Sequence, residues 1–140
     1  MSRRDLEFSL EWLEKARHDL FTVDKLAADA DSPGDILAFH CQQAIEKSVK
    51  GLLTAHGVKF PRTHDLVELL ELSLPHLPSL EVWRDEFMRI SHYAITVRYP
   101  DSVLEVDGAT LNRAVKTAWE VFRTVDSHLI NLRREENRSE

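Results

Sequence analysis

The chain has 140 residues, of which 43% are hydrophobic and 30% charged, and its formal net charge is −6 at pH 7. These values are typical of one soluble globular domain and exclude a disordered chain. No apolar run approaches the ~20 residues that a membrane-spanning helix needs, and the negative charge argues against a protein that contacts the phosphates of duplex DNA over a broad surface.

The beginning of the chain and its cysteine content indicate a compartment. Arg3 and Arg4 are not followed by the apolar stretch of a signal peptide. Cys41 is the only cysteine, so no intrachain disulfide can form, as is usual in a reducing environment. We therefore expect a cytoplasmic protein.

Apolar residues recur at steps of three and four, which is typical of amphipathic helices. The first such run predicts a helix over residues 5–28. Ser32 and Pro33 then resemble the N-cap and first residue of a second helix, which extends to residue 55 or 56. Gly57 is its expected C-terminal stop.

Three further helices are predicted in the second half. Asp65 and Glu68 resemble a capping box that begins a short helix over residues 66–72. Ser79 is the expected N-cap of a helix over residues 80–97, which Pro100 ends. The last helix covers residues 108–132. Trp12, Trp83 and Trp119 lie on separate helices and are expected to be core or interface anchors.

This pattern predicts an all-α fold, an up-and-down bundle of four long antiparallel helices plus one short helix. We expect a single domain over residues 1–134. Residues 135–140 are polar and are expected to form a frayed C-terminal tail.

The second predicted helix carries the most unusual polar residues. Gln43, Glu46 or Lys47, and Lys50 share one face, and Glu46 and Lys50 are also spaced for an ion pair one turn apart. The surrounding residues 36–64 contain four cations and one anion, a local balance of +3 on an acidic protein. Two interpretations stay open: a polar face that meets solvent or another helix, or a face that contacts phosphate or ribose.

Two corners are further candidates for anion binding. His64 precedes the short helix at its N-terminus, where free backbone N–H groups favour anions. Arg98 lies where the following long helix ends, in the run Arg98-Tyr99-Pro100-Asp101, and a guanidinium suits phosphate. Each has a structural alternative, a turn at His64 and a helix cap at Arg98. No C-x-x-C or H-x-x-x-H spacing occurs, so we predict no metal site.

Three motifs, taken in order, resemble the HEPN domain family: Gln42-Gln43-Ala44-x-Glu46-Lys47-x-x-Lys50, Thr63-His64-Asp65-Leu66 and Arg98-Tyr99-Pro100-Asp101. The resemblance covers about Asp5 to Leu132. It implies a helical bundle that commonly pairs as a homodimer, binds a nucleotide or RNA, and often works with a separately encoded minimal nucleotidyltransferase in a toxin–antitoxin-like pair. We expect the ligand contacts to be Gln43, Glu46, Lys47, Lys50, His64, Arg98, Tyr99 and Asp101, without a cofactor.

Many members of that family are metal-independent endoribonucleases that use an Arg followed, four to six residues later, by a His. Here no His follows Arg98 before His128, so the motif is not found and we predict no catalytic residue. Two alternatives remain. One is an endoribonuclease toxin with a rearranged pair, Arg89 with His92 or His92 with Arg98. The other is a non-catalytic structural dimer that scaffolds a partner enzyme.

Overall fold

The structure, a computed structural model, describes residues 2–96, 100 and 106–139, with the backbone alone for residues 94–96. Its elements are helices, with no strand in this part of the chain. In chain order they are α1 (Arg3–Ala27), α2 (Gly34–Ala55), α3 (Leu66–Ser73), the 3-10 helix η1 (Pro78–Trp83), α4 (Arg84–Thr96) and α5 (Gly108–Arg138). The all-α prediction is confirmed.

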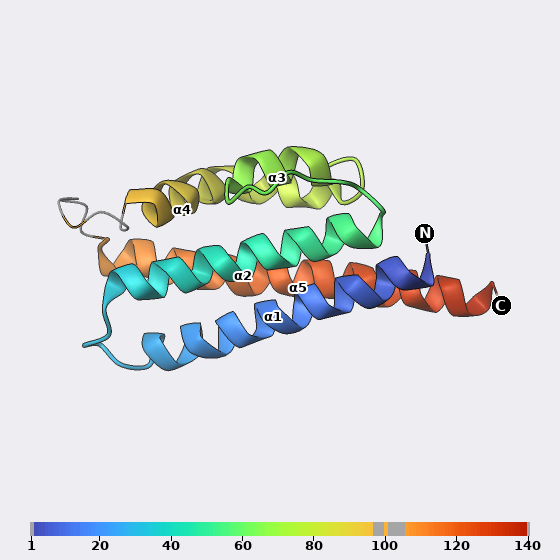
Figure 1. Ribbon diagram of the computed structural model, residues 1–140. Coiled ribbons are helices and arrows are strands. Elements are labelled where there is room, and N and C mark those ends of the chain that lie inside the picture. The colour runs from blue at the N-terminus through green and yellow to red at the C-terminus, as the bar shows by residue number, and fades with distance from the viewer. Residues whose placement is uncertain (1, 97–99, 101–105, 140) are drawn as a thin grey trace.

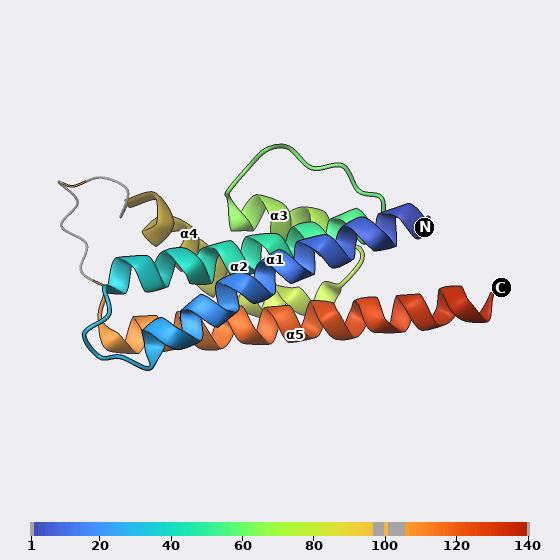
Figure 2. The same ribbon diagram turned by 60° about the horizontal axis from the view of Figure 1, so that its bottom comes forward.

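The long helices α1, α2, α4 and α5 run in alternating directions, and the two ends of the chain lie at the same end of the bundle (Figure 1). Helix α2 is central, because it packs against all four other α-helices. After α2 the chain turns back along the bundle as an extended segment before α3 begins (Figure 2). This return segment, residues 57–65, is bonded to α2, because the side-chain amide of Gln42 donates to the backbone carbonyl of His64.

The central place of α2 explains its burial. Apolar residues such as Ile45 and Leu52 are fully buried in the core, as the periodicity predicts. However, the polar residues Gln42, Glu46 and Lys50 are also buried, at 7% exposure or less. Of the polar face whose role the sequence left open, Glu46 and Lys50 are therefore buried, whereas Gln43 and Lys47 are partly exposed.

The two ends of α2 differ in how well they were predicted. Pro33, and not Ser32, is the N-cap, with φ −61° and ψ 121°, and it makes no side-chain capping bond. The predicted Ser32 cap is wrong because the helix begins one residue later than the Ser-Pro pattern indicates. Gly57 ends the helix as predicted: its φ of 68° is the left-handed conformation that glycine favours.

The start of α3 is capped as predicted, through half of a capping box. The Asp65 carboxylate accepts a bond from the backbone N–H of Val67, 3.0 Å away. The backbone N–H of Asp65 donates to the Thr63 hydroxyl, at 3.0 Å. In a complete capping box the Glu68 side chain would accept the bond from the backbone N–H of Asp65, and here Thr63 accepts it instead.

Two predicted helix boundaries are wrong. Pro78 begins a 3-10 helix, so α4 begins at Arg84 instead of residue 80, and Ser79 lies inside η1 instead of capping a helix. Helix α5 continues past residue 132 to Arg138, through most of the segment predicted to be frayed. That segment is rich in Arg and Glu, which favour helix even where no apolar face is packed. The predicted end at residue 97 lies outside the described residues.

Helices α1 and α2 lie close together at Gly51. A Cβ atom placed there would lie 3.2 Å from the Cβ of Trp12 and 3.3 Å from the carbonyl oxygen of Ser9. These distances are shorter than most Cβ contacts, so a side chain at this position would push Trp12 and the backbone of Ser9 away from α2. Of the described helices, none is long and apolar enough to cross a membrane.

Candidate functional site

Two carboxylates organise the polar side chains of α2. The first is Asp19 of α1, whose side chain is only 10% exposed. One carboxylate oxygen faces Nδ1 of His40 at 2.9 Å, and the other accepts a bond from the ammonium group of Lys47 at 2.6 Å. A short polar network therefore ties α1 to α2.

The second carboxylate is Glu46, which is 5% exposed and has three partners. Its Oε1 accepts a bond from the side-chain amide of Gln42 at 3.0 Å and faces Nδ1 of His64 at 2.8 Å. Its Oε2 accepts a bond from the ammonium group of Lys50 at 3.1 Å. Gln42 also donates to the backbone carbonyl of His64, and Gln43 donates to Gln42. This network fastens the return segment to α2.

The partner at Nδ1 decides how His64 presents its ring. A carboxylate can only accept hydrogen bonds, so the Nδ1 of His64 carries the hydrogen that is directed at Glu46. In neutral His64 the other nitrogen, Nε2, then carries a lone pair; in the protonated ring it is a donor. Because 63% of the side chain is exposed, this second nitrogen is available to a ligand.

A groove of about 410 Å³ lies between α1 and the return segment. The rings of Trp12 and Phe60 meet edge to face, with their centroids 6.3 Å apart. The ammonium group of Lys50 lies 5.7 and 5.8 Å from the two ring centroids, at the base of the groove. The groove is lined by Trp12, Lys50, Phe60, Pro61, Arg62, Thr63 and His64.

The cations near this groove differ in their surroundings. Lys47 forms an ion pair with Asp19, and Lys50 forms one with Glu46. Because Lys50 is buried, its charge requires such a partner. Arg62, in contrast, is exposed and forms no ion pair with a described residue.

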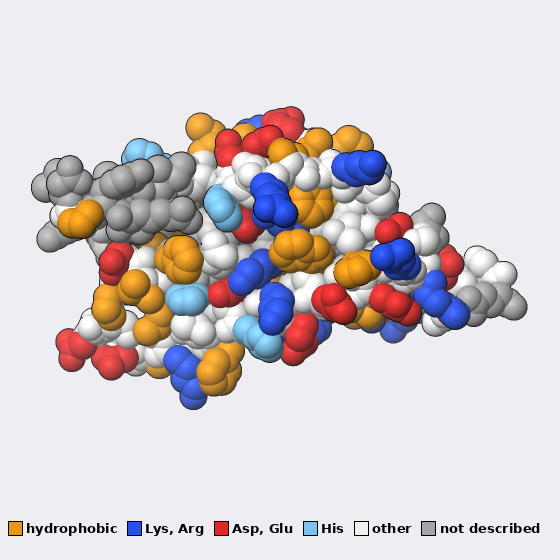
Figure 3. All heavy atoms as spheres, viewed as in Figure 1, with side chains coloured by type: hydrophobic (Ala, Val, Ile, Leu, Met, Phe, Trp, Pro, Cys, Tyr) orange, Lys and Arg blue, Asp and Glu red, His pale blue; other side chains and the backbone are white. Residues whose placement is uncertain are grey.

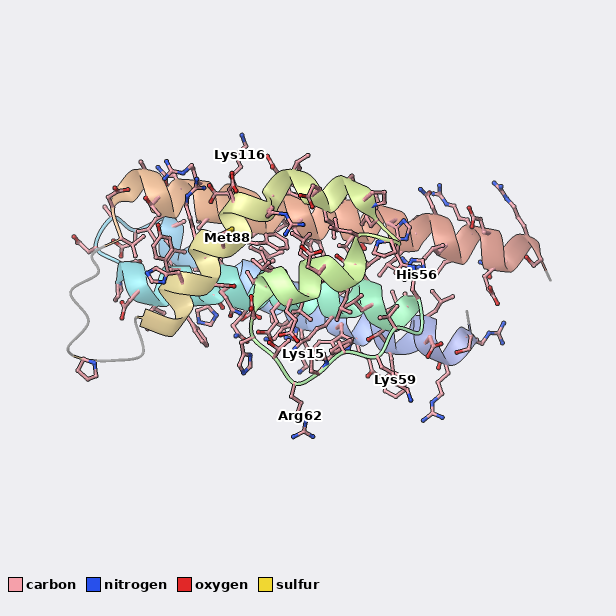
Figure 4. All side chains as sticks on the ribbon, turned by 90° about the horizontal axis from the view of Figure 1, so that it is seen from above. Lys15, His56, Lys59, Arg62, Met88 and Lys116 are labelled. Carbon is pink, nitrogen blue, oxygen red and sulfur yellow. The ribbon has the colours of Figure 1, made fainter. Side chains whose placement is uncertain are left out.

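Cations and aromatic rings gather on this side of the molecule. Side chains of Lys, Arg and His lie next to hydrophobic ones across the middle of the face in Figure 3. Arg62 points outward from the return segment, and Lys15 of α1 lies on the same side (Figure 4). Lys116 of α5 points away on the opposite side of the bundle.

The structure brings together five of the predicted contacts: Gln43, Glu46, Lys47, Lys50 and His64. Arg98, Tyr99 and Asp101 lie outside the described residues. Sequence reasoning missed Asp19, His40, Trp12, Phe60 and Arg62 as members of the site. The cation-rich stretch that includes Arg62 was the available signal, and Trp12 was assigned to a core or interface role.

Of the residues of the ribonuclease alternative, Arg89 and His92 lie on α4, whereas Arg98 lies outside the described residues. Arg89 pairs with Glu86 one turn earlier, at 2.5 Å, and is 47% exposed. His92 is exposed on the same helix. Within the described ranges, no group of three or more His, Cys, Asp or Glu residues is placed to hold a metal ion.

The HEPN domain model matches residues 9–128 of the chain, which therefore belongs to the HEPN family. This confirms the resemblance found in the three sequence motifs. It supports a function related to nucleotides or RNA in general, and HEPN domains commonly dimerise. No curated protein and no solved structure matches the chain.

Proposed function

We propose that this chain is a nucleotide- or RNA-binding HEPN protein whose ligand lies in the groove between α1 and the return segment. It acts as a homodimer, together with a separately encoded minimal nucleotidyltransferase, in a toxin–antitoxin-like pair. It is a binding protein and not an enzyme. The Arg98-Tyr99-Pro100-Asp101 motif supplies a second anion contact, a role that rests on the sequence motif alone.

One observation carries the proposal: the groove combines the paired rings of Trp12 and Phe60 with the guanidinium of Arg62, which has no ion pair among the residues that the structure describes. Aromatic rings bind nucleobases by stacking, which is worth about 1–3 kcal/mol per base. A guanidinium suits phosphate because its planar N–H groups can donate two parallel bonds. An apolar platform next to a free cation therefore fits both halves of a nucleotide.

The buried network has a supporting role in this proposal. Glu46 holds Lys50 below the rings and Nδ1 of His64 at the groove edge. Gln42 fastens the backbone of the return segment, so the groove exists before a ligand enters. Such preorganisation lowers the entropy cost of binding. Arg62 and Nε2 of His64 then make the direct contacts, with Gln43 and Lys47 at the flank.

Isothermal titration with AMP, ADP, ATP and short single-stranded RNA tests this site. We expect Arg62→Ala to weaken binding about tenfold, the loss of one charge-assisted phosphate contact. Arg134→Ala is the matched control: it removes an exposed arginine near the end of α5 and should leave affinity unchanged. Wild-type protein that binds none of these ligands, or Arg62→Ala protein that binds as wild type, would overturn the proposed site.

The proposed partners need separate measurements. Sedimentation velocity of the purified chain should give a dimer mass. Co-expression with the product of an adjoining nucleotidyltransferase gene should yield a complex that survives gel filtration. A monomer mass, or separate elution of the two proteins, would contradict these parts of the proposal while leaving the groove untouched.

A further inference from the structure

A second hollow adjoins the groove and shares Trp12 with it. Its volume is about 270 Å³, and it is lined by Phe8, Glu11, Trp12 and Lys15. These residues follow steps of three and four along α1, so they form one face of that helix. Trp12 therefore stands between two depressions, one on α1 and one under the return segment.

The two hollows share one combination of side chains, an aromatic ring next to a cation. Phe8 is 46% exposed, and the guanidinium of Arg4 lies 5.6 Å from the centroid of its ring. Lys15 borders this hollow and forms no ion pair with a described residue. In the groove, the corresponding groups are Phe60 and Arg62. Each hollow thus offers an aromatic surface and a cation without an ion pair in the described part of the chain.

We infer that the two hollows are consecutive base-stacking subsites, so that the ligand is single-stranded RNA of two or more nucleotides and not a free mononucleotide. This inference rests on the proposed function and narrows its ligand. One base stacks on the solvent-facing side of the Trp12–Phe60 ring pair, and the next stacks beside Phe8. Lys15 and Arg62 bind the phosphates that connect them.

The size and charge of the surface favour a single strand. Pockets for drug-sized molecules measure roughly 300–1,000 Å³. The two hollows, of about 270 and 410 Å³, lie just below and near the lower end of that range, which suits a group as small as one base. Bases inside an A-form duplex are already stacked on one another and cannot reach side chains in this way. The cations are also few, whereas binding to a duplex relies on many phosphate contacts.

Glu11 places a negative charge in the hollow on α1. It is the one carboxylate among the residues that line the two hollows. A fixed negative charge next to Lys15 repels a phosphate that passes there. Glu11→Gln should therefore tighten binding of oligonucleotides two- to threefold, roughly the effect of one exposed charge, and leave AMP binding unchanged.

A length series tests the inference. Affinities of wild type for AMP and for adenylate RNA of two to six nucleotides are measured by isothermal titration. We expect at least about a tenfold gain from AMP to the dinucleotide, the value of one added stacked base. Phe8→Ala should abolish that gain while AMP affinity stays the same. Lys15→Ala should reduce the gain and flatten its dependence on salt.

Phe21→Ala is the matched control, because Phe21 lies on the same helix, is 64% exposed and contacts Lys25 instead of the hollow. It should change none of these affinities. If AMP and the oligonucleotides bind equally and Phe8→Ala has no effect, the inference is overturned and the proposed function stands. Absence of any binding overturns both. A shift in sedimentation of Phe8→Ala protein with RNA affinity unchanged would overturn the inference too, since a second copy of the chain then covers α1.

Discussion

Lys50 and Glu46 form an ion pair inside the bundle, with 3.1 Å between Nζ and Oε2 and with 9% and 5% of their side chains exposed. Their spacing of one helical turn predicts the pair, but on an exposed helix it would contribute only about 0.2–0.5 kcal/mol. Burial makes the stability of the fold depend more strongly on this ion pair. Each charge has lost its water, so each depends on the other and on the hydrogen bonds around Glu46.

Removal of Lys50 should therefore be costly. We expect Lys50→Ala to lower the free energy of unfolding by about 3 kcal/mol, since Glu46 is left as a buried, poorly balanced charge. Urea unfolding followed by circular dichroism measures this. Lys116→Ala, which breaks an exposed pair with Glu120, is the control and should cost less than about 0.5 kcal/mol. Equal, small losses in the two variants would contradict the buried pairing.

Gly51 provides a test of the close approach between α1 and α2. Alanine is the better helix former by about 1 kcal/mol, so propensity alone predicts a gain in stability. We expect instead that Gly51→Ala lowers the free energy of unfolding by about 1–2 kcal/mol, because the new methyl group meets Trp12 and the backbone of Ser9.

Gly108→Ala is the matched control for that substitution. Gly108 begins α5, and a Cβ atom there would have no neighbour within 4 Å. This variant should be as stable as wild type or more stable by up to about 1 kcal/mol. If both glycine substitutions stabilise the protein, the tight contact of α1 with α2 at Gly51 is contradicted.

Three histidines meet where α2, the α3–η1 turn and α5 converge. Nε2 of His56 lies 2.8 Å from Nε2 of His128, and the ring of His76 stacks on His56 with centroids 4.5 Å apart. Burial, and then the charges of His76 and His128, lower the pKa of His56 from 6.5 to about 4. Burial is also the main cause of the lowered pKa of His128.

These shifts predict that stability falls with acid. His56 binds a proton near pH 6.5 in the unfolded chain but only near pH 4 in the folded protein. The free energy of unfolding therefore decreases as the pH falls from about 6.5 to about 4. Because His56 is partly exposed, we expect its share to be about 1 kcal/mol. Urea unfolding at pH 7, 6, 5 and 4 measures the effect. His56→Gln should flatten the slope between pH 6.5 and 4, and an unchanged slope would contradict the account.

Cys41 should be chemically silent in the folded protein. It is fully buried on α2, and burial raises the pKa of its thiol to about 12. Since the thiolate is the reactive form, iodoacetamide should label native protein very slowly and urea-unfolded protein quickly. Mass spectrometry after timed quenching gives both rates. Rapid labelling of native protein would place Cys41 outside the core.

Much of the fold follows from local signals. The periodicity predicts all the α-helices, Gly57 predicts the end of α2, and Asp65 predicts the start of α3. Each of these features is determined by residues that are close together in the sequence. The 3-10 start before α4 was missed, because Pro78 restricts the backbone without deciding which helix type follows.

The site was less predictable, because its geometry depends on residues distant in sequence. Periodicity shows that Lys47 and Lys50 share a face of α2 but not which element covers that face. The partner of Lys47 is Asp19, 28 residues earlier. The contact between Trp12 and Phe60 depends on the chain turning back after α2. The sequence therefore places Lys47 and Lys50 on one helix but does not show that Asp19 and Glu46 pair with them.

The three tryptophan indoles allow the most direct test of the groove. The indole N–H groups of Trp83 and Trp119 bond to Glu120 and Asp24 elsewhere on the bundle, whereas Trp12 lines both hollows. Two-dimensional ¹H–¹⁵N NMR resolves all three during a titration with a short single-stranded RNA. The account predicts that the Trp12 signal shifts while the other two stay in place. A Trp12 signal that stays still at saturating RNA would contradict it.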